Sequence, residues 1–246
     1  MKRIFLPVLL IVITSCADLA KFAKEIDPNR PLTQTEVVNG LKQALIIGAD
    51  SAATELSATN GYYLDQLVKI TLPPEASVVT DNISKLPGGK ELVNDVVLRI
   101  NRSAEEAAKE AAPVFARAVS DMTIRDGFEI LRGEKNAATQ YLKEQTYGEL
   151  YNLYQPKIKI SLNKKIVGNL STNDSWNKLT GQWNRIAGSF VGKVADLQTV
   201  ETDLDRYLTE KALDGLFLKL ALEEEKIRNN PRERVTQLLK RVFGQS

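Results

Sequence analysis

The stretch DLDRYLTEKALDGLFLKLALEEEKIRN, residues 203–229, is the longest uninterrupted helical pattern in this 246-residue chain. At about 100° per residue, its apolar side chains fall on two nearly opposite sides of a helix. One side carries Leu204, Tyr207, Leu208, Ala212, Leu218 and Leu222, and the other carries Leu213, Leu216, Phe217, Leu220 and Ile227. A helix that is apolar around most of its circumference is normally surrounded by other helices. We therefore expect this segment to run through the middle of the domain.

Capping and stop signals divide the rest of the chain into further helices. Thr33 with Glu36 forms a capping box that opens a helix reaching about Asn60. Thr123 caps a second helix that ends at Gly133, and a last helix follows Asn230-Pro231. These signals predict an all-α fold with little or no β structure.

Two long helical stretches contain signals that predict interruptions. Lys90 to Asp121 includes Pro113 and a capping box that begins at Ser103, so we expect a bent helix or two helices in line. Farther on, we expect a short helix over 137–144, and then a new helix that starts at the capping box of Thr146 and bends at Pro156. In total the patterns predict about eight to ten helices in a single domain, packed around residues 203–229.

Residues 1–16, MKRIFLPVLLIVITSC, have the basic start, short apolar run and small residues of a secretion signal. The apolar run is too short to span about 30 Å of hydrocarbon, so we do not expect a retained transmembrane helix. Its end, Ile13 to Cys16, resembles the lipobox of bacterial lipoproteins. This resemblance implies cleavage before Cys16 and acylation of that cysteine, followed by a tether over 17–32 and one helical domain over 33–246.

Several acyl chains on one residue hold a protein firmly on a membrane, because each buried methylene adds roughly 0.8 kcal/mol. The expected partner is thus a membrane, reached through the N-terminal acyl chains. Ala17 directly follows the cysteine, and by resemblance to Gram-negative sorting rules this favours the outer membrane, with the domain facing the periplasm.

Charge and cysteine content exclude several functions. The whole chain has 33 basic and 31 acidic residues, and loss of Lys2 and Arg3 with the signal leaves 31 of each. A neutral mature chain does not match a nucleic-acid partner, which requires a basic stripe. The one dense lysine cluster, Lys157 to Lys165, is interpreted as a solvated helix face. Cys16 is the only cysteine, so no disulfide forms within the chain.

The chain has no histidine and no free cysteine after acylation, which removes the commonest general base, the usual zinc ligand and thiol nucleophiles. No nucleophile elbow, phosphate loop or calcium loop is present in the sequence. The carboxylates at 223–225 are interpreted as helix-surface charge, with Glu224 and Arg228 as a stabilising pair four residues apart. We expect no cofactor and no metal, and the composition favours a protein that is not an enzyme.

The charges inside 203–229 are the most informative polar residues. If the helix is enclosed, Lys211, Asp214 and Lys219 need partners, because an unpaired buried charge costs several kcal/mol. Other polar residues lie within helical patterns and could meet them: Asn101, Arg102, Thr123, Asp126, Thr139 and Arg228. Two interpretations stand. These residues form a structural network with helix caps, or they line a polar pocket that binds a small amphiphile or a piece of lipid or glycan.

Three stretches carry a family resemblance: INRSAEEAA (100–108), MTIRDGFEILRGEKNAATQYL (122–142) and YLTEKALDGLFLKLALEEEKIRNNPRERVTQLLKRVFG (207–244). On these stretches the chain resembles the bacterial domain of unknown function family numbered 4197, whose members are exported, mostly helical and often lipoproteins. The resemblance covers roughly residues 33–244 and implies a single all-helical domain. It implies no reaction, ligand or catalytic residue.

Three hypotheses for function follow. The first is a lipid-anchored, non-enzymatic helical domain that binds or scaffolds at a membrane surface of the envelope. The alternative is a carboxylate-based hydrolase of envelope glycan or lipid, with Asp214 or Asp126 as the essential acid. A third is a partner of other envelope proteins.

Overall fold

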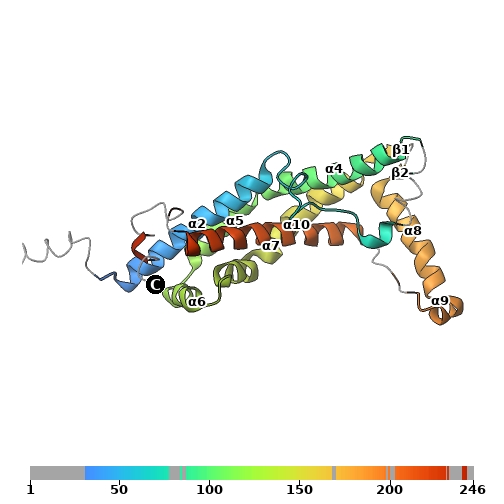
Figure 1. Ribbon diagram of the computed structural model, residues 1–246. Helices are drawn as coiled ribbons and strands as arrows, with labels where there is room; N and C mark the ends of the chain where they lie inside the picture. Colours follow the sequence, from blue (N-terminus) through green and yellow to red (C-terminus); the bar gives the residue numbers. More distant parts are fainter. Residues whose placement is uncertain are drawn as a thin grey trace, which may run out of the picture.

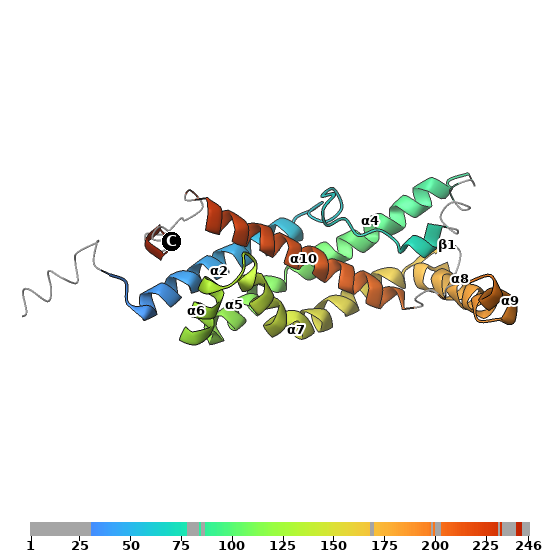
Figure 2. The same ribbon diagram turned by 60° about the horizontal axis from the view of Figure 1, so that its bottom comes forward.

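Helix α10, Leu204–Asn229, is the element against which the other long helices pack. In the computed structural model, the described residues are 31–77, 84, 87–167, 170–197, 199, 203–230, 232 and 240–242. In this part of the chain α10 runs along the long axis of the molecule (Figures 1 and 2). Its buried residues include Leu208, Leu213 and Leu216, from both predicted apolar sides, while Leu218 is 41% exposed. The prediction of an all-α fold around 203–229 is confirmed.

Helices α2 (Gln34–Ser57) and α7 (Ala137–Leu162) both run antiparallel to α10. Glu55, near the end of α2, contacts Lys219. Gly48, two turns earlier on α2, lies against Ile227, two turns later on α10. On α7, the first turn meets Glu224 and the last turns meet the start of α10. The three helices bury one continuous apolar core.

Two helices in line, α4 (Gly89–Ala108) and α5 (Ala111–Asp121), replace the single pattern of residues 90–121. Pro113 lies in the first turn of α5, where its missing N–H removes no helix hydrogen bond. The predicted interruption is confirmed, but the capping box at Ser103 is wrong, because its hydroxyl is buried and donates to the Ile100 carbonyl at 2.7 Å. Helix α6 (Ile124–Arg132) follows and begins at the predicted cap, Thr123.

Helix α7 is continuous, so the predicted boundary at residues 144–146 is wrong. The Thr146 hydroxyl does not cap a new helix and instead donates to the Leu142 carbonyl, one turn earlier, at 2.6 Å. The helix also continues through Pro156. Burial of one face, including Leu142, Leu150 and Tyr154, stabilises the helix across both sites.

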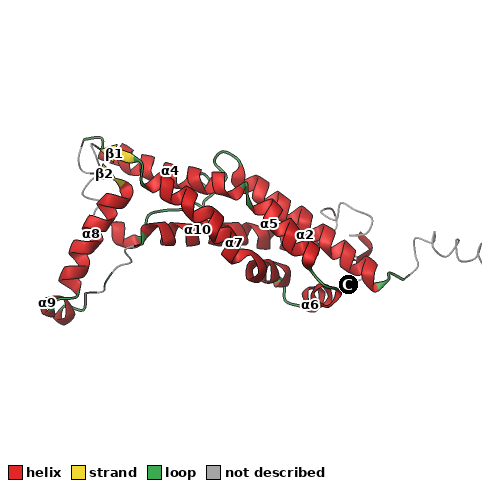
Figure 3. Cartoon of the chain, turned by 180° about the vertical axis from the view of Figure 1, so that it is seen from behind, coloured by secondary structure: helices red, strands yellow, loops and turns green. Residues whose placement is uncertain are grey.

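A short β hairpin interrupts the helical order after α7. Strands β1 (Lys165–Val167) and β2 (Leu170–Ser171) pair antiparallel. Ser171 then caps α8 (Thr172–Ala187), and a tight turn leads to α9 (Phe190–Val194). A 3-10 turn, η1 (Pro74–Ala76), begins directly after Pro73. Helices α8 and α9 project from one end of the body, opposite the start of α2 (Figures 1 and 3).

Several predictions lie outside the described residues. These are the signal and lipobox, nearly all of the tether, and most of the last helix. Near the C-terminus, in the described part of the last helix, the side chain of Val242 packs against the core. Among the described helices, none carries an apolar stretch long enough to cross a bilayer.

Candidate functional site

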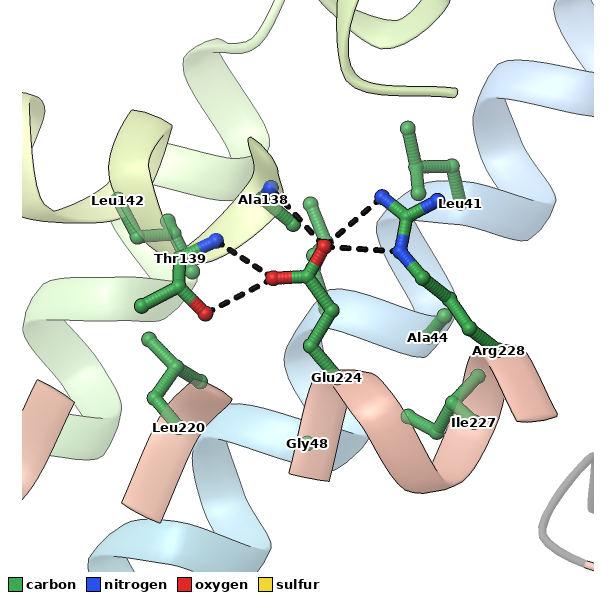
Figure 4. A pocket seen from close by; sticks show the side chains of 11 residues that line it. Leu41, Ala44, Gly48, Ala138, Thr139, Leu142, Leu220, Glu224, Ile227 and Arg228 are labelled. Carbon is green, nitrogen blue, oxygen red and sulfur yellow. Dashed lines mark hydrogen bonds and ion pairs between the residues drawn. The ribbon is translucent and has the colours of Figure 1, made fainter. Parts of the chain in front are cut away.

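A buried carboxylate, Glu224 on α10, receives five hydrogen bonds or ion-pair contacts (Figure 4). Its two oxygens accept the backbone N–H of Ala138 at 3.1 Å, the N–H of Thr139 at 2.8 Å and the Thr139 hydroxyl at 2.8 Å. Arg228 adds contacts from Nε at 2.9 Å and from its terminal nitrogen at 2.8 Å. The first N–H groups of a helix have no intrahelical acceptor. Glu224 therefore caps α7 from another helix, because Asn136 makes no side-chain cap there.

Arg228 connects this cap to a second helix end. Its guanidinium also donates to the Ile130 carbonyl, in the last turn of α6, at 3.1 Å. A carboxylate at a helix N-terminus and a cation at a helix C-terminus are both stabilised by the helix dipole. The sequence predicted the Glu224–Arg228 pair, but as surface charge. In the structure the side chains are only 6% and 18% exposed, so the pair joins α6, α7 and α10 inside the fold.

The cavity beside Glu224 is small. It is lined by Leu41, Gly48, Leu142 and Ile227 as well as the polar residues, and its volume is about 20 Å³. That volume holds one water molecule. Thr139 and Arg228, both predicted as polar interior residues, lie at this cavity and contact Glu224.

Lys219 is a buried cation of α10, and it has two acidic partners. Its ammonium lies 2.5 Å from Glu55 on α2 and 2.5 Å from Asp65 in the following loop, with the side chain 9% exposed. Burial opposes its charge, but the hydrogen bonds to Asp65 and Glu55 outweigh burial and raise the pKa of Lys219. In turn, the hydrogen bond from Lys219 lowers the pKa of Asp65. The expected partner requirement of Lys219 is thus met.

Asn101 and Arg102 on α4 hold the loop of residues 58–73. Buried Asn101 accepts from the Ile70 N–H at 2.9 Å and donates to the Ile70 carbonyl at 2.8 Å. Arg102 donates to Asn60, which has a positive φ of 73°, and pairs with Glu105 at 2.5 Å. This cluster attaches an irregular loop to a helix.

Glu105 completes that attachment, and sequence reasoning missed it. Its carboxylate is 5% exposed and accepts the N–H groups of Tyr62 and Tyr63 at 3.3 and 3.2 Å. A carboxylate next to apolar helix positions was the available signal, but its loop partners lie about 40 positions away and could not be inferred from spacing.

Four predicted residues do not join any interior cluster. Lys211 and Asp214 pair at 3.3 Å on the surface, with side chains 49% and 53% exposed, so the expectation that they are enclosed is wrong. The reason is geometric, because the apolar positions leave one narrow strip of α10 in solvent. Thr123, which is exposed, and Asp126, which is half-buried, form the capping box of α6.

Tyr154 has a fully buried hydroxyl that meets no hydrogen-bond partner among the described residues. It lies near Tyr62, whose hydroxyl donates to the Ala212 carbonyl at 2.8 Å. Burial raises the pKa of both phenols, so both stay neutral in the physiological range. Both phenols belong to the buried core and contribute to its packing.

The model of a family described as a protein of unknown function, DUF4197, matches residues 31–244. The chain belongs to the DUF4197 family. The match confirms the family resemblance and extends over the full helical body. Neither the curated proteins nor the solved structures contain a significant match.

Larger hollows of this DUF4197 protein open to solvent. One of about 430 Å³ lies between α4 and α7, and its lining includes Arg99, Arg102, Lys157 and Lys164. The nearby acids Asp95, Glu105 and Glu110 pair with three of these four cations. Another, of about 510 Å³, lies between α2 and α5 and is mainly apolar. In the part of the chain that the structure describes, no three potential metal ligands come together.

Proposed function

We propose that this DUF4197 protein is a lipid-anchored, non-enzymatic helical domain of the bacterial cell envelope, which binds or scaffolds through its outer surface. The observation behind the non-enzymatic part of the proposal is that the buried charged side chains are already engaged in structural contacts. Glu105, Glu224 and Lys219 each satisfy a helix end, a loop or an opposite charge. A group that acts as acid or base needs access to a substrate proton.

The two acids that a hydrolase would use are also accounted for. Asp126 accepts the Thr123 N–H at 2.9 Å, and this hydrogen bond lowers its pKa. Asp214 forms a surface ion pair with Lys211. Glycosidases place two carboxyl groups about 5 to 10 Å apart around one bond. Asp126 and Asp214 lie on different helices, α6 and α10, and line no common cavity.

The anchoring part of the proposal rests on the sequence before residue 31. The lipobox at Ile13 to Cys16 supports acylation of Cys16, and Ala17 supports sorting to the outer membrane with the domain in the periplasm. A tether over 17–32 then connects the acylated cysteine to the first helix, α2.

Cell fractionation tests this proposal. Wild-type protein should remain in the outer-membrane pellet after a high-salt wash, and Cys16→Ser should remove it from that fraction. In the same cells, Asp126→Asn and Asp214→Asn should retain whatever envelope phenotype wild type complements. Loss of complementation by either stable, correctly located variant would support the hydrolase instead.

A further inference from the structure

The tip formed by the end of α8 and by α9 exposes a group of large apolar side chains. The exposed fractions are 82% for Phe190, 72% for Val191, 72% for Val194 and 55% for Ile186. Single exposed apolar residues are common, but a contiguous group of this kind marks a surface that contacts another molecule or a membrane.

The turn at the tip is built to hold these side chains outward. Ser189 caps α9 by accepting the Gly192 N–H at 3.1 Å, and its hydroxyl donates to the Ile186 carbonyl at 2.6 Å. Gly192 is buried against the end of α8, where a Cβ would lie 2.3 Å from the Ile186 carbonyl oxygen and 2.6 Å from that of Ala187. Only glycine permits this close approach. The exposure thus belongs to a defined turn.

The charge of the tip differs from that of the rest of the protein. From Lys178 to Ala195 the sequence has three basic residues, Lys178, Arg185 and Lys193, and no acidic residue until Asp196. All three basic side chains are exposed. The rest of the mature chain is close to neutral. Exposed apolar side chains flanked by cations are complementary to a lipid bilayer, which has an apolar interior beneath anionic headgroups.

Position also separates the tip from the body. In all three views the tip lies at the end opposite the start of α2, and it projects away from the long helices (Figures 1, 2 and 3). A contact made there does not compete with packing in the body. It also lies far from the end at which the N-terminal tether enters the fold.

We propose that this tip is a second membrane contact, in which Phe190, Val191 and Val194 enter the interfacial layer of an anionic phospholipid bilayer and Arg185 and Lys193 contact its headgroups. Interfacial binding increases with buried apolar area and with attraction between basic residues and anionic lipid. The contact needs no acyl chain, so it can be tested apart from the lipid anchor.

The test uses the full mature chain with Cys16→Ser, which cannot be acylated. Its partition onto vesicles of phosphatidylethanolamine and phosphatidylglycerol is measured by co-sedimentation and compared with neutral phosphatidylcholine vesicles. Wild-type tip residues should give binding to the anionic vesicles that weakens with salt. Phe190→Ser with Val191→Ser should lower the partition coefficient by about tenfold to a hundredfold. Arg185→Glu with Lys193→Glu should lower it by about tenfold, and only on anionic vesicles.

A matched control removes apolar surface elsewhere. Leu64 and Leu67 are 62% and 65% exposed in the loop after α2, so Leu64→Ser with Leu67→Ser deletes similar area away from the tip and should leave binding unchanged. Insertion is followed with a polarity-sensitive fluorophore on Val191→Cys, the only cysteine of that chain, whose emission should shift to the blue on anionic vesicles.

Three results would overturn the proposal. The first is equal binding by the tip and control variants. The second is an unshifted fluorophore despite binding. The third is no vesicle binding together with concentration-dependent self-association that Phe190→Ser with Val191→Ser abolishes, because the tip would then join two copies of the chain. Circular dichroism melting of every variant confirms that it is folded.

Discussion

Replacing Glu224 with alanine removes the cap of α7 and the partner of Arg228 in one change. Two backbone N–H groups in the first turn of α7 lose their acceptor, and a guanidinium that is 18% exposed loses its counter-charge. Breaking a buried ion pair by removing one partner costs about 3–5 kcal/mol. Arg228 keeps its bond to the Ile130 carbonyl and part of its hydration, so we expect the lower end, about 3 kcal/mol.

The measurements are equilibrium unfolding in guanidinium chloride, which gives the free energy of unfolding, and thermal melting, both monitored by circular dichroism. For a chain of this size, about 3 kcal/mol corresponds to a fall of about 6–12 °C in Tm. Glu225→Ala is the matched control, because Glu225 is the exposed neighbour on the same helix, and it should change stability by less than about 0.5 kcal/mol.

A double-mutant cycle separates the pair from the cap. Arg228→Ala alone should cost about 2 kcal/mol, because Glu224 then keeps only its helix donors. Removing both side chains should cost about 1 kcal/mol less than the sum of the two single changes, since neither partner is left unpaired. If Glu224→Ala and Glu225→Ala are equally stable, the reasoning that assigns Glu224 to the fold is refuted.

Three further predictions concern other positions. Lys219→Met should lower the free energy of unfolding by about 1–2 kcal/mol near neutral pH. In wild type, the stabilisation that Asp65 contributes is present above its unfolded pKa of about 3.9 and is lost as the pH falls through its lowered folded pKa. Urea unfolding from pH 5 to 2 should therefore show a shallower decline of stability in the variant. Gly215→Ala should destabilise the protein by about 1 kcal/mol or more in thermal melts, because the new Cβ would lie 2.9 Å from the buried Tyr62 ring. Gly148→Ala, with open space around its Cβ, should instead stabilise α7 by about 0.5–1 kcal/mol. A change of stability in the same direction for both variants would contradict this packing. Asp214→Asn should change Tm by less than about 2 °C, since the ion pair is exposed, and a large loss would mean that Asp214 has an interior role.

Local signals in the sequence predicted the helices well where the cap and the apolar face agree. Thr33 and Thr123 cap the predicted helices because each has an acid three positions later and an apolar face behind it. The same pattern failed at Ser103 and Thr146. There the flanking residues on both sides pack into one core, and each hydroxyl donates within a helix that continues. A capping box is a local preference of about 1 kcal/mol, and burial of a helix face outweighs it.

The polar residues of the interior were predicted as a set, but their grouping was not. Each of three predicted polar residues does meet a polar partner: Lys219 pairs with Asp65, Asn101 with the backbone of Ile70, and Arg102 with Asn60. Their partners lie on distant segments, and no spacing within one helix encodes such contacts. Lys211 and Asp214 follow the same sequence pattern as Lys219, yet they face solvent, because only the assembled bundle decides which strip of α10 stays uncovered.

The most direct test of the proposed function is the mass of the N-terminal peptide from protein purified out of membranes of the native host. A lipid-anchored envelope protein should yield a mature chain that begins at Cys16 and carries a diacylglyceryl group on its sulfur. A mature chain that begins at another residue, or an unmodified Cys16 in protein that still fractionates with the outer membrane, would contradict the proposal.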